Sequence, residues 1–339
     1  TGLRDATITR VPAGGLLAAV GYADGSFRTG RLGLESTYQP VEELRLESVP
    51  RRAGDAVRVD GSVVVRHAED RFSRVSLVAE LGAPPAEPLA APVIDVDVVQ
   101  LAGGPLVAAL DERGNVRVET VTAKRNMLTG KMSTTPRGVS IAPAEGFSPR
   151  FIRVSALGDQ VFLIAADGAA RRHLIRDLAA PVEVERFHVT VAGAEVTAVE
   201  RLFGGVALAV GDSSGRVRVL FPSRGDAPTA TTSSSAPADG LTMAVARTFE
   251  PPAAASPVVA IAASPRSRLF AVADATGAVR MLQSTTGREV LEAPAPKAAA
   301  DAAPALVPEH LCTRPTRPRH TPGRPRATRR SNRSSGSFP

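Results

Sequence analysis

VALAVGDSSGRVRV, residues 206–219, is an apolar run, a polar turn and a second run that alternates apolar with charged residues. The same pattern recurs in four further stretches, LLAAVGYADGSFR (16–28), LVAALDERGNVRV (106–118), VFLIAADGAARR (161–172) and LFAVADATGAVRM (269–281). Asp bonds to its own backbone in turns, and Gly supplies a positive φ without steric cost. Each copy therefore predicts a β-hairpin.

The turns identify the repeat and its length. A weaker copy, VRVDGSVVV at Val57–Val65, fills a first gap that is twice as long as the others, so the units follow one another at roughly fifty residues. We expect the turns at Gly25, Gly61, Gly114, Gly168, Asp212, Gly215, Asp274 and Gly277. Units of this length, each with room for four strands, predict an all-β fold, a β-propeller with six recognisable blades and a place for a seventh in the intact protein.

Further strands flank the hairpins. Val191–Leu202 and Ser256–Ser264 are expected to be inner strands, and Gln283–Leu291 an outer strand. Asp5–Val11 leads into the first hairpin, which makes it an inner strand and leaves the outer strand of that blade to the C-terminus. The Ala/Pro-rich segment after Leu291 cannot pair with a strand of the first blade, because proline lacks a backbone donor. We therefore expect an incomplete ring with an exposed edge on the first or sixth blade.

The chain divides into a propeller domain, residues 1–292, and an Ala/Pro linker with a disordered Arg/Pro-rich tail, residues 293–339. The formal net charge of +7 arises in the tail, where residues 310–339 hold many arginines and no acid. Three interpretations of the tail stay open: text read out of frame, a genuine disordered tail, or a basic arm. No aromatic residues are interleaved for base stacking, so no nucleic-acid partner is expected.

Ser213 lies in Gly211–Gly215, GDSSG, which fits the G-x-S-x-G pattern of a hydrolase nucleophile elbow. The equivalent positions of other repeats hold Ala23, Glu112 and Ala275, so the repeat does not require serine. An elbow also needs a helix after the turn, whereas the alternation after Gly215 predicts a strand. The sequence favours a plain turn, and we expect no catalytic residue, no enzymatic activity and no cofactor.

Other chemistry is sparse. Asp95 and Asp97 in VIDVDVVQ (93–100) are expected on one face of a strand, where they could hold a hard cation or act as an acid–base pair, although a solvated polar strand face is favoured. GKM at residues 130–132 fails as a phosphate-binding loop because Met132 replaces Ser or Thr and Arg125 replaces the first Gly.

The histidines and arginines also lack a ligand pattern. No pair of histidines has the spacing of a metal site, so surface or strand-edge positions are expected and no metal site is predicted. The five histidines are His67, His173, His188, His310 and His320. Cys312 is the single cysteine, which excludes an internal disulfide. Four arginines could form an anion-binding patch, although a solvated sheet face is favoured; they are Arg216, Arg218, Arg266 and Arg268.

Four longer stretches, at residues 16–35, 118–135, 203–222 and 264–291, resemble the large WD-repeat-like propeller domain that some bacterial phosphate-type ABC transporter permeases carry between their first transmembrane helix and the permease core. The resemblance spans roughly residues 1–292. Two features depart from it: the chain has no tryptophan, with Leu220 and Phe221 where a blade aromatic would stand, and the transmembrane helices that should follow are missing.

The resemblance implies a non-enzymatic, soluble fragment of an extramembrane domain that acts in protein interaction and in the regulation of transport. The implied partners are other subunits of the importer or its solute-binding protein, and contact with the membrane would be made only through the missing transmembrane segments. The implied location is the periplasmic face of the bacterial inner membrane. A free-standing propeller scaffold is the alternative, and a serine hydrolase that uses Ser213 is the least favoured one.

Overall fold

The structure is a computed structural model that describes residues 2–10, 15–39, 56–59, 62–68, 71–85, 87–125, 129–130, 132–191, 193–224, 239–252 and 256–295. Every regular element in these residues is a β-strand. None of these segments contains a helix with the length and apolarity needed to cross a membrane. Gly61, His310, Cys312, His320 and the predicted tail beyond residue 295 lie outside the described residues.

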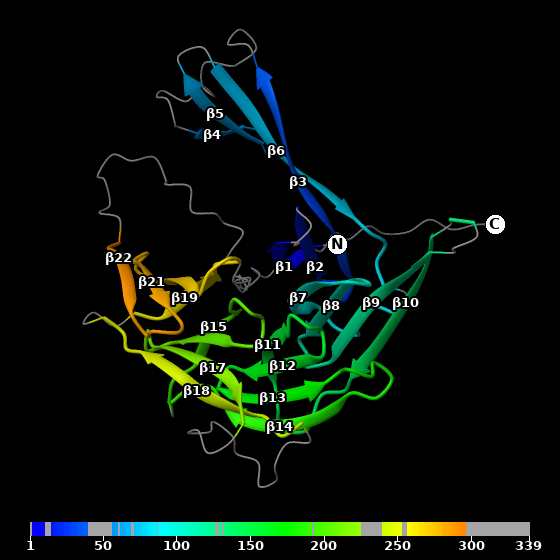
Figure 1. Ribbon diagram of the computed structural model, residues 1–339, viewed down its shortest axis with the longest axis vertical. Helices are drawn as coiled ribbons and strands as arrows, with labels where there is room; N and C mark the ends of the chain where they lie inside the picture. The colour runs from blue at the N-terminus through cyan, green and yellow to red at the C-terminus, as the bar shows by residue number, and fades with distance from the viewer. Residues whose placement is uncertain are drawn as a thin grey trace, which may run out of the picture. The chain divides into compact units, whose positions relative to one another are not determined.

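Five antiparallel sheets follow one another around a common centre (Figure 1), and each sheet is a propeller blade. Blades 2 to 5 have four strands each, in chain order from the inner to the outer strand. Blade 2 has β7 (Val93–Leu101), β8 (Gly104–Asp111), β9 (Val116–Arg125) and β10 (Met132–Ile141); blade 3 has β11 (Pro149–Val154), β12 (Gln160–Ala165), β13 (Ala169–Leu174) and β14 (Val182–His188). Blade 4 has β15 (Val196–Arg201), β16 (Leu208–Asp212), β17 (Val217–Ser223) and β18 (Thr242–Phe249); blade 5 has β19 (Val258–Ala263), β20 (Leu269–Asp274), β21 (Val279–Gln283) and β22 (Glu289–Ala293).

Blade 1 is a larger sheet of six strands in the order β1-β2-β3-β6-β5-β4. Its strands are β1 (Leu3–Arg10), β2 (Leu16–Tyr22), β3 (Phe27–Gln39), β4 (Ala56–Val59), β5 (Ser62–Ala68) and β6 (Arg71–Leu81). The first part of β3 pairs with β2, and its continuation from Gly30 onward pairs with β6. The far halves of β3 and β6, together with β4 and β5, extend away from the blade (Figure 1) and are called the arm below.

Two predictions about the ring are wrong. The hairpin at Val57–Val65 is not a sixth blade, because β5 adds to the edge of β6 and β4 to the edge of β5 within the sheet of blade 1. Blade 1 also does not lack an outer strand for want of one from the C-terminus, because β6 supplies it from the same part of the chain. Both errors have one cause. β3 has 13 residues and is long enough to pair with both β2 and β6, so the long segment between the turns at Gly25 and Gly114 adds strands to blade 1 instead of forming another blade.

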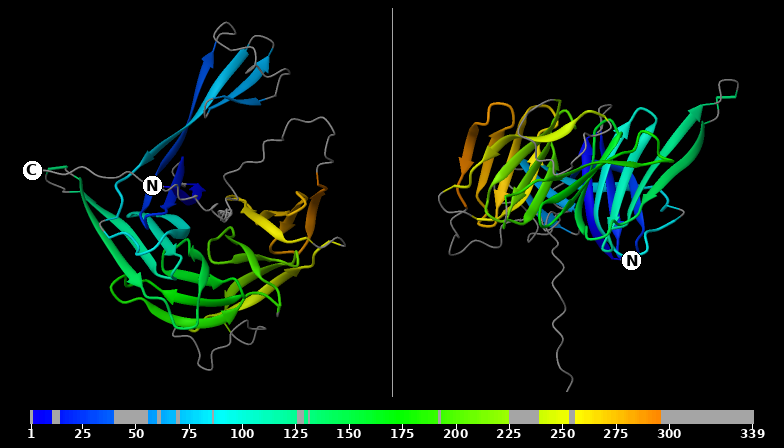
Figure 2. Two further views of the ribbon diagram at one scale, coloured as in Figure 1. Left: turned by 180° about the vertical axis from the view of Figure 1, so that it is seen from behind. Right: turned by 90° about the horizontal axis from the view of Figure 1, so that it is seen from below.

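The hydrophobic core lies between the blades rather than within them. Four buried clusters each combine side chains of two consecutive blades, at the junctions 1/2, 2/3, 3/4 and 4/5. Figure 2 shows the sheets standing face to face. Val, Leu, Ala and Ile make up most of these clusters, because the sequence has few large aromatic residues. Buried phenylalanines join three of them, with Phe27 at junction 1/2, Phe162 at junction 3/4 and Phe270 at junction 4/5.

Blades 1 and 5 end the series within the described residues. On blade 5, Ala262, Ala271, Met281 and Leu291 form one row across all four strands, on the face that does not contribute to the junction with blade 4. Leu291 in this row is 57% exposed. On blade 1, Leu3 and Ile8 of the inner strand are likewise exposed.

The hairpin turns share one backbone geometry in all five blades. In blade 4, Gly215 donates its N–H to the carbonyl of Asp212, and Asp212 Oδ1 accepts the N–H groups of Ser214 and Arg216. Gly215 has a φ of +82°, which L side chains rarely adopt. Gly25, Gly114, Gly168 and Gly277 also lie in turns between the second and third strands of their blades with positive φ. Asp274 repeats the role of Asp212 in blade 5.

Candidate functional site

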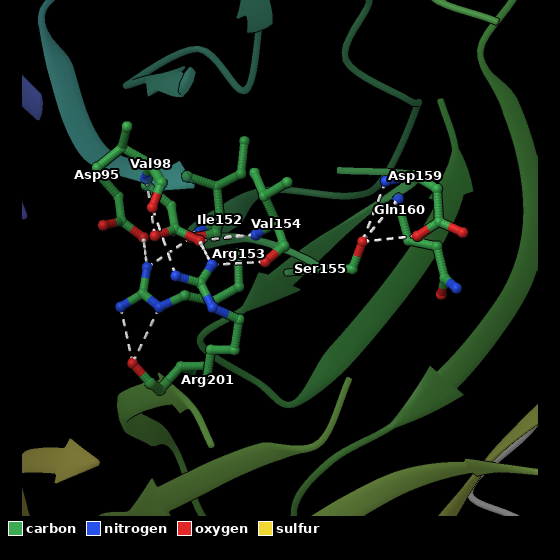
Figure 3. A network of polar contacts seen from close by, with 11 residues as sticks. Asp95, Val98, Ile152, Arg153, Val154, Ser155, Asp159, Gln160 and Arg201 are labelled. Atoms are coloured by element: carbon green, nitrogen blue, oxygen red, sulfur yellow. Dashed lines mark hydrogen bonds and ion pairs between the residues drawn. The ribbon is translucent and has the colours of Figure 1, made fainter. Parts of the chain in front are cut away.

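The densest cluster of buried charges lies on the inner strands of blades 1 to 4. β7 begins with alternating valines that pack into the junction with blade 1, and Asp95 and Asp97 occupy the positions between them. Both side chains reach the neighbouring inner strand β11, as Figure 3 shows for Asp95. Asp95 Oδ2 accepts the backbone N–H of Ile152 at 2.7 Å and an Arg153 N–H at 2.8 Å.

Asp97 repeats this arrangement two residues further along β7. Its Oδ2 accepts the N–H of Val154 at 2.7 Å and an N–H of Arg201 at 2.7 Å, and its Oδ1 accepts the N–H of Val98. An inner strand spaces alternate residues about 7 Å apart. The two carboxylates therefore match two N–H groups on the free edge of β11, those of Ile152 and Val154.

Two arginines extend the network to blade 4 (Figure 3). Arg153 donates through Nε and Nη2 to the carbonyl of Val199 on β15, at 3.1 and 2.7 Å. Arg201 of β15 donates back to the carbonyl of Val154 at 2.6 Å. On the other side, Asp5 of β1 accepts the N–H of Val96 at 3.0 Å. The network thus links four consecutive blades, and it is called the central network below.

Burial raises the pKa of Asp95 and of two acids beside it. It raises the pKa of Asp95 from 3.8 to about 7, assisted by the neighbouring charges of Asp5 and Asp97 and opposed by Arg153. Burial also raises the pKa of Asp5, whose carboxyl forms a hydrogen bond with that of Asp95, and the pKa of Glu200 on β15. The hydrogen bond between the two carboxyls opposes this shift at Asp5, where it lowers the pKa.

The central network corrects the interpretation of Asp95 and Asp97. They do lie on one side of a strand, as expected, but they are only 7% and 4% exposed and do not face solvent. Their oxygens are engaged by backbone N–H groups and guanidinium groups. In the part of the chain that the structure describes, no three His, Cys, Asp or Glu side chains are grouped so that they could hold a metal ion. The arrangement tethers blades to one another.

Ser213 lies between β16 and β17, in a strand–turn–strand segment rather than a strand–turn–helix segment. Its N–H donates to the carbonyl of Glu195, just before β15. Ala23, Glu112 and Ala275 donate the same backbone bond to the residue at the start of their own inner strands. The conserved element of the turn is therefore a backbone contact, and the Ser213 hydroxyl adds a second bond by accepting the N–H of Glu195.

The structure separates the remaining predicted positions. His188 is exposed, and so is His67, whose Nε2 lies 2.7 Å from the hydroxyl of Ser73. His173 corrects the expectation of a surface position, because it is only 6% exposed on β13. Arg216 pairs with Glu250 at 2.8 Å, and Arg268 donates to Thr285 Oγ1.

Sequence reasoning missed a second buried ionic cluster, at the junction of blades 3 and 4. Arg172 on β13 is fully buried, donates to Glu185 on β14 at 2.8 Å and pairs with Asp239. Glu185 in turn accepts the N–H of Met243 on β18 at 2.7 Å. The signal available in the sequence was the pair Arg171-Arg172 in a strand whose even positions face a core, but one of two adjacent arginines cannot be singled out from alternation alone.

No protein-family model and no curated protein matches this chain. Among solved structures, the crystal structure of the Chaetomium thermophilum Sqt1 is similar, with a TM-score of 0.46 and 12% sequence identity. The similarity covers 84% of this chain, and the chain spans 58% of the length of that protein. The assignment of a β-propeller rests on the chain's own five sheets, four of which have four strands.

Proposed function

We propose that this chain is a non-enzymatic protein-interaction module, and that in the intact protein it is the extramembrane propeller of a phosphate-type ABC importer permease. The observation that supports an interaction role is the arm of blade 1. Leu34 of β3 and Leu77 of β6 are directly paired, and Tyr38 follows on the same face of β3. These side chains are 67%, 57% and 81% exposed, respectively.

The two faces of the arm differ in a way that favours partner binding. The opposite face holds Val64 and Phe72, which are buried. The face with Leu34, Leu77 and Tyr38 continues into Val75 and Val63, which pair with each other across β6 and β5. A contiguous apolar patch with a projecting tyrosine is the composition typical of a binding surface on a soluble domain. Its partners in the proposed setting are the other subunits of the importer or its solute-binding protein, on the periplasmic side.

The transporter assignment rests on the resemblance of residues 16–35, 118–135, 203–222 and 264–291 to that permease domain. Its direct test is the DNA on both sides of the coding sequence. We expect codons for membrane-spanning helices beyond the propeller, in the same or a shifted frame, with genes for an ATPase subunit and a second permease nearby. Neighbouring genes of unrelated function would contradict the assignment and leave the free-standing propeller scaffold.

The interaction role is tested by binding. The solute-binding protein encoded beside the chain is immobilised, and the affinity of the chain is measured by biolayer interferometry. The double variant Tyr38→Ser, Leu77→Ser should weaken binding by at least about tenfold, because exposed aromatic and leucine side chains carry much of the energy of such interfaces. Leu157→Ser is the matched control, since Leu157 is 72% exposed on blade 3. Equal affinity of both variants would remove the arm from the interface.

A further inference from the structure

Blade 1 and blade 5 each have one sheet face that no other blade covers in the described residues. Buried clusters join every consecutive pair of blades from 1/2 to 4/5, and none of these clusters joins blade 5 to blade 1. Leu3 and Ile8 on the free face of blade 1 are 57% and 56% exposed, and Leu291 on the free face of blade 5 is 57% exposed. Because the blades repeat one another, an existing junction shows what fits such faces.

Junction 4/5 provides the comparison for the free face of blade 1. Val258 begins the inner strand of blade 5, directly before a register shift, and is buried against blade 4. Leu3 begins the inner strand of blade 1, directly before the same register shift. Five residues later, Ile8 matches Ala263, which packs against the cluster of junction 4/5. The exposed apolar side chains of blade 1 therefore occupy the positions with which blade 5 contacts blade 4.

An arginine lies three residues after the turn glycine in every blade. The five arginines are Arg28, Arg117, Arg171, Arg218 and Arg280. At junction 4/5, Arg280 donates to the carbonyls of Gly215 and Glu250, at 3.1 and 3.0 Å. Gly215 is the turn glycine of blade 4, so the arginine of one blade binds the hairpin turn of the blade before it.

Arg28 has the position of Arg280, but no blade precedes it in the described residues. Its guanidinium lies over the ring of Tyr22, 5.8 Å from the ring centre, and its Nε has no hydrogen-bond partner in this part of the chain. Together with Asp24 and Ser26, these two side chains line an open recess of about 200 Å³. By the geometry of junction 4/5, this is the place for the hairpin turn of a neighbouring blade.

Blade 5 has the matching half of such a contact. Ala271 and Met281 pair with each other in the free row of blade 5. Ala209 and Val219 hold the same positions in blade 4, where they are buried in the cluster of junction 4/5. The turn of blade 5 ends at Gly277, which has a φ of +88° like the other turn glycines. One chain therefore has both faces of a blade junction.

We propose that the free face of blade 5 docks on the free face of blade 1 of a second copy of this chain. Leu3 and Ile8 then pack against the apolar row that includes Leu291, and Arg28 donates to the carbonyl of Gly277 across the contact. The contact is heterologous, because the two copies use different faces. A second copy is the occupant because it supplies both the row and the turn that the recess requires. The proposal is independent of the importer assignment and of the arm.

Sedimentation velocity of the full chain over a range of concentrations tests the contact. The wild-type chain should associate, whereas Leu3→Asp, Ile8→Asp and, separately, Leu291→Asp should be monomeric, because docking would bury an unpaired carboxylate. The double variant Leu34→Asp, Leu77→Asp in the arm is the matched control, since these leucines are 67% and 57% exposed, and it should associate like the wild type. A monomeric wild-type chain, as expected if a blade of another protein is the occupant, would overturn the proposal. So would a monomeric control, which would place the contact on the arm.

A mixture of the two interface variants tests the pairing of the faces. Leu3→Asp, Ile8→Asp keeps the face of blade 5, and Leu291→Asp keeps the face of blade 1, so the equimolar mixture should form a 1:1 dimer. A mixture that stays monomeric would overturn the proposal. Serine replaces aspartate at the same positions where an aspartate variant does not fold, and the wild-type measurement requires no variant.

Arg28→Met tests the polar part of the contact. It removes a charged donor to the Gly277 carbonyl, so association should weaken by about tenfold. Arg31→Met is the control, because Arg31 is exposed on the opposite face of β3. Equal association of the two variants would contradict the assigned role of Arg28.

Discussion

The junction between blades 2 and 3 and the junction between blades 4 and 5 have similar apolar cores, but different polar links. At junction 2/3, Asp95 and Asp97 on the inner strand accept N–H groups of the next blade and pair with arginines. At junction 4/5, Arg280 of β21 donates to two backbone carbonyls of blade 4, those of Gly215 and Glu250. One junction includes a carboxyl group whose pKa burial raises to about 7, that of Asp95, and the other is linked by a guanidinium that contacts backbone carbonyls.

The difference predicts that the two halves of the propeller respond differently to pH. In the unfolded chain Asp95 titrates near its ordinary value of 3.8, and in the folded chain near 7. Between these values the folded state holds a proton that the unfolded state releases. The contribution of Asp95 to the free energy of unfolding is therefore largest at low pH, falls as pH rises through this window, and levels off above about pH 7. Junction 4/5 has no such group among the contacts described.

The largest effect is expected for Arg153→Met. At pH 8 the change leaves Asp95 without its cation and the Val199 carbonyl without two donors, which should lower the free energy of unfolding by about 3–5 kcal/mol. At pH 5, where Asp95 is protonated, the loss should be smaller. Urea unfolding at both pH values measures it, with Arg150→Met, an exposed arginine on the same strand, as the control. An equal loss at both pH values would show that Asp95 is ionised throughout.

Asp95→Asn tests the contribution of the carboxyl group at junction 2/3. Asparagine keeps an oxygen that can accept from Ile152 and Arg153 but has no proton to release. Asp95 should lower the wild-type free energy of unfolding by up to about 1.4 kcal/mol per pH unit between about pH 4 and 7. The variant should lose this contribution and keep those of Asp5 and Glu200, whose pKa values burial also raises. Thermal unfolding at several pH values is the measurement. A wild-type stability that rises over this window would contradict the assignment of the raised pKa.

Arg280→Met is the corresponding change at junction 4/5. It removes the donors of two backbone carbonyls, and we expect a loss of about 1–3 kcal/mol. Because neither partner titrates, the loss should be the same at pH 5 and pH 8. A loss that differs between pH 5 and pH 8 would contradict the assignment of this link to the two carbonyl contacts.

The hairpins of this fold could be predicted from the sequence, whereas the pairing between distant strands could not. Each hairpin is predictable because an apolar strand, an Asp/Gly turn and a second strand follow one another within about 15 residues, so local chemistry determines its structure. The number of blades could not be predicted in this way. VRVDGSVVV does form a hairpin, but its sheet is determined by the long-range pairing of β5 with β6. The repeated sequence pattern predicts a hairpin, but it does not predict the strands with which that hairpin pairs.

The central network illustrates the same limit for side chains. Alternation correctly placed Asp95 and Asp97 on one side of β7, yet whether that side faces solvent or the next inner strand depends on the position of β11, more than fifty residues later in the chain. Their partners Arg153 and Arg201 carry no local signal.

Leu291→Ser tests the face of blade 5 that has no neighbouring blade in the described residues. Leu291 is 57% exposed, so its replacement should change the free energy of unfolding by less than about 0.5 kcal/mol. Self-association should weaken by several-fold, because an exposed apolar row is a site of association. Sedimentation velocity over a range of concentrations measures it, with Val182→Ser on the outer strand of blade 3 as the control. A wild-type chain that is monomeric throughout would contradict the expected association.

Ser213→Ala should have the smallest effect. The turn is closed by backbone bonds that the change leaves intact, and the Glu195 N–H that loses the hydroxyl is exposed and can bind water, so the loss should stay within about 0.5 kcal/mol. A fluorophosphonate probe addresses catalysis directly. We expect no stoichiometric labelling of the wild-type chain, because the residue after the turn enters β17 and places no helix N-terminus behind the hydroxyl. Labelling that disappears in Ser213→Ala would instead identify a nucleophile and restore the hydrolase hypothesis, whatever the stability of the variant.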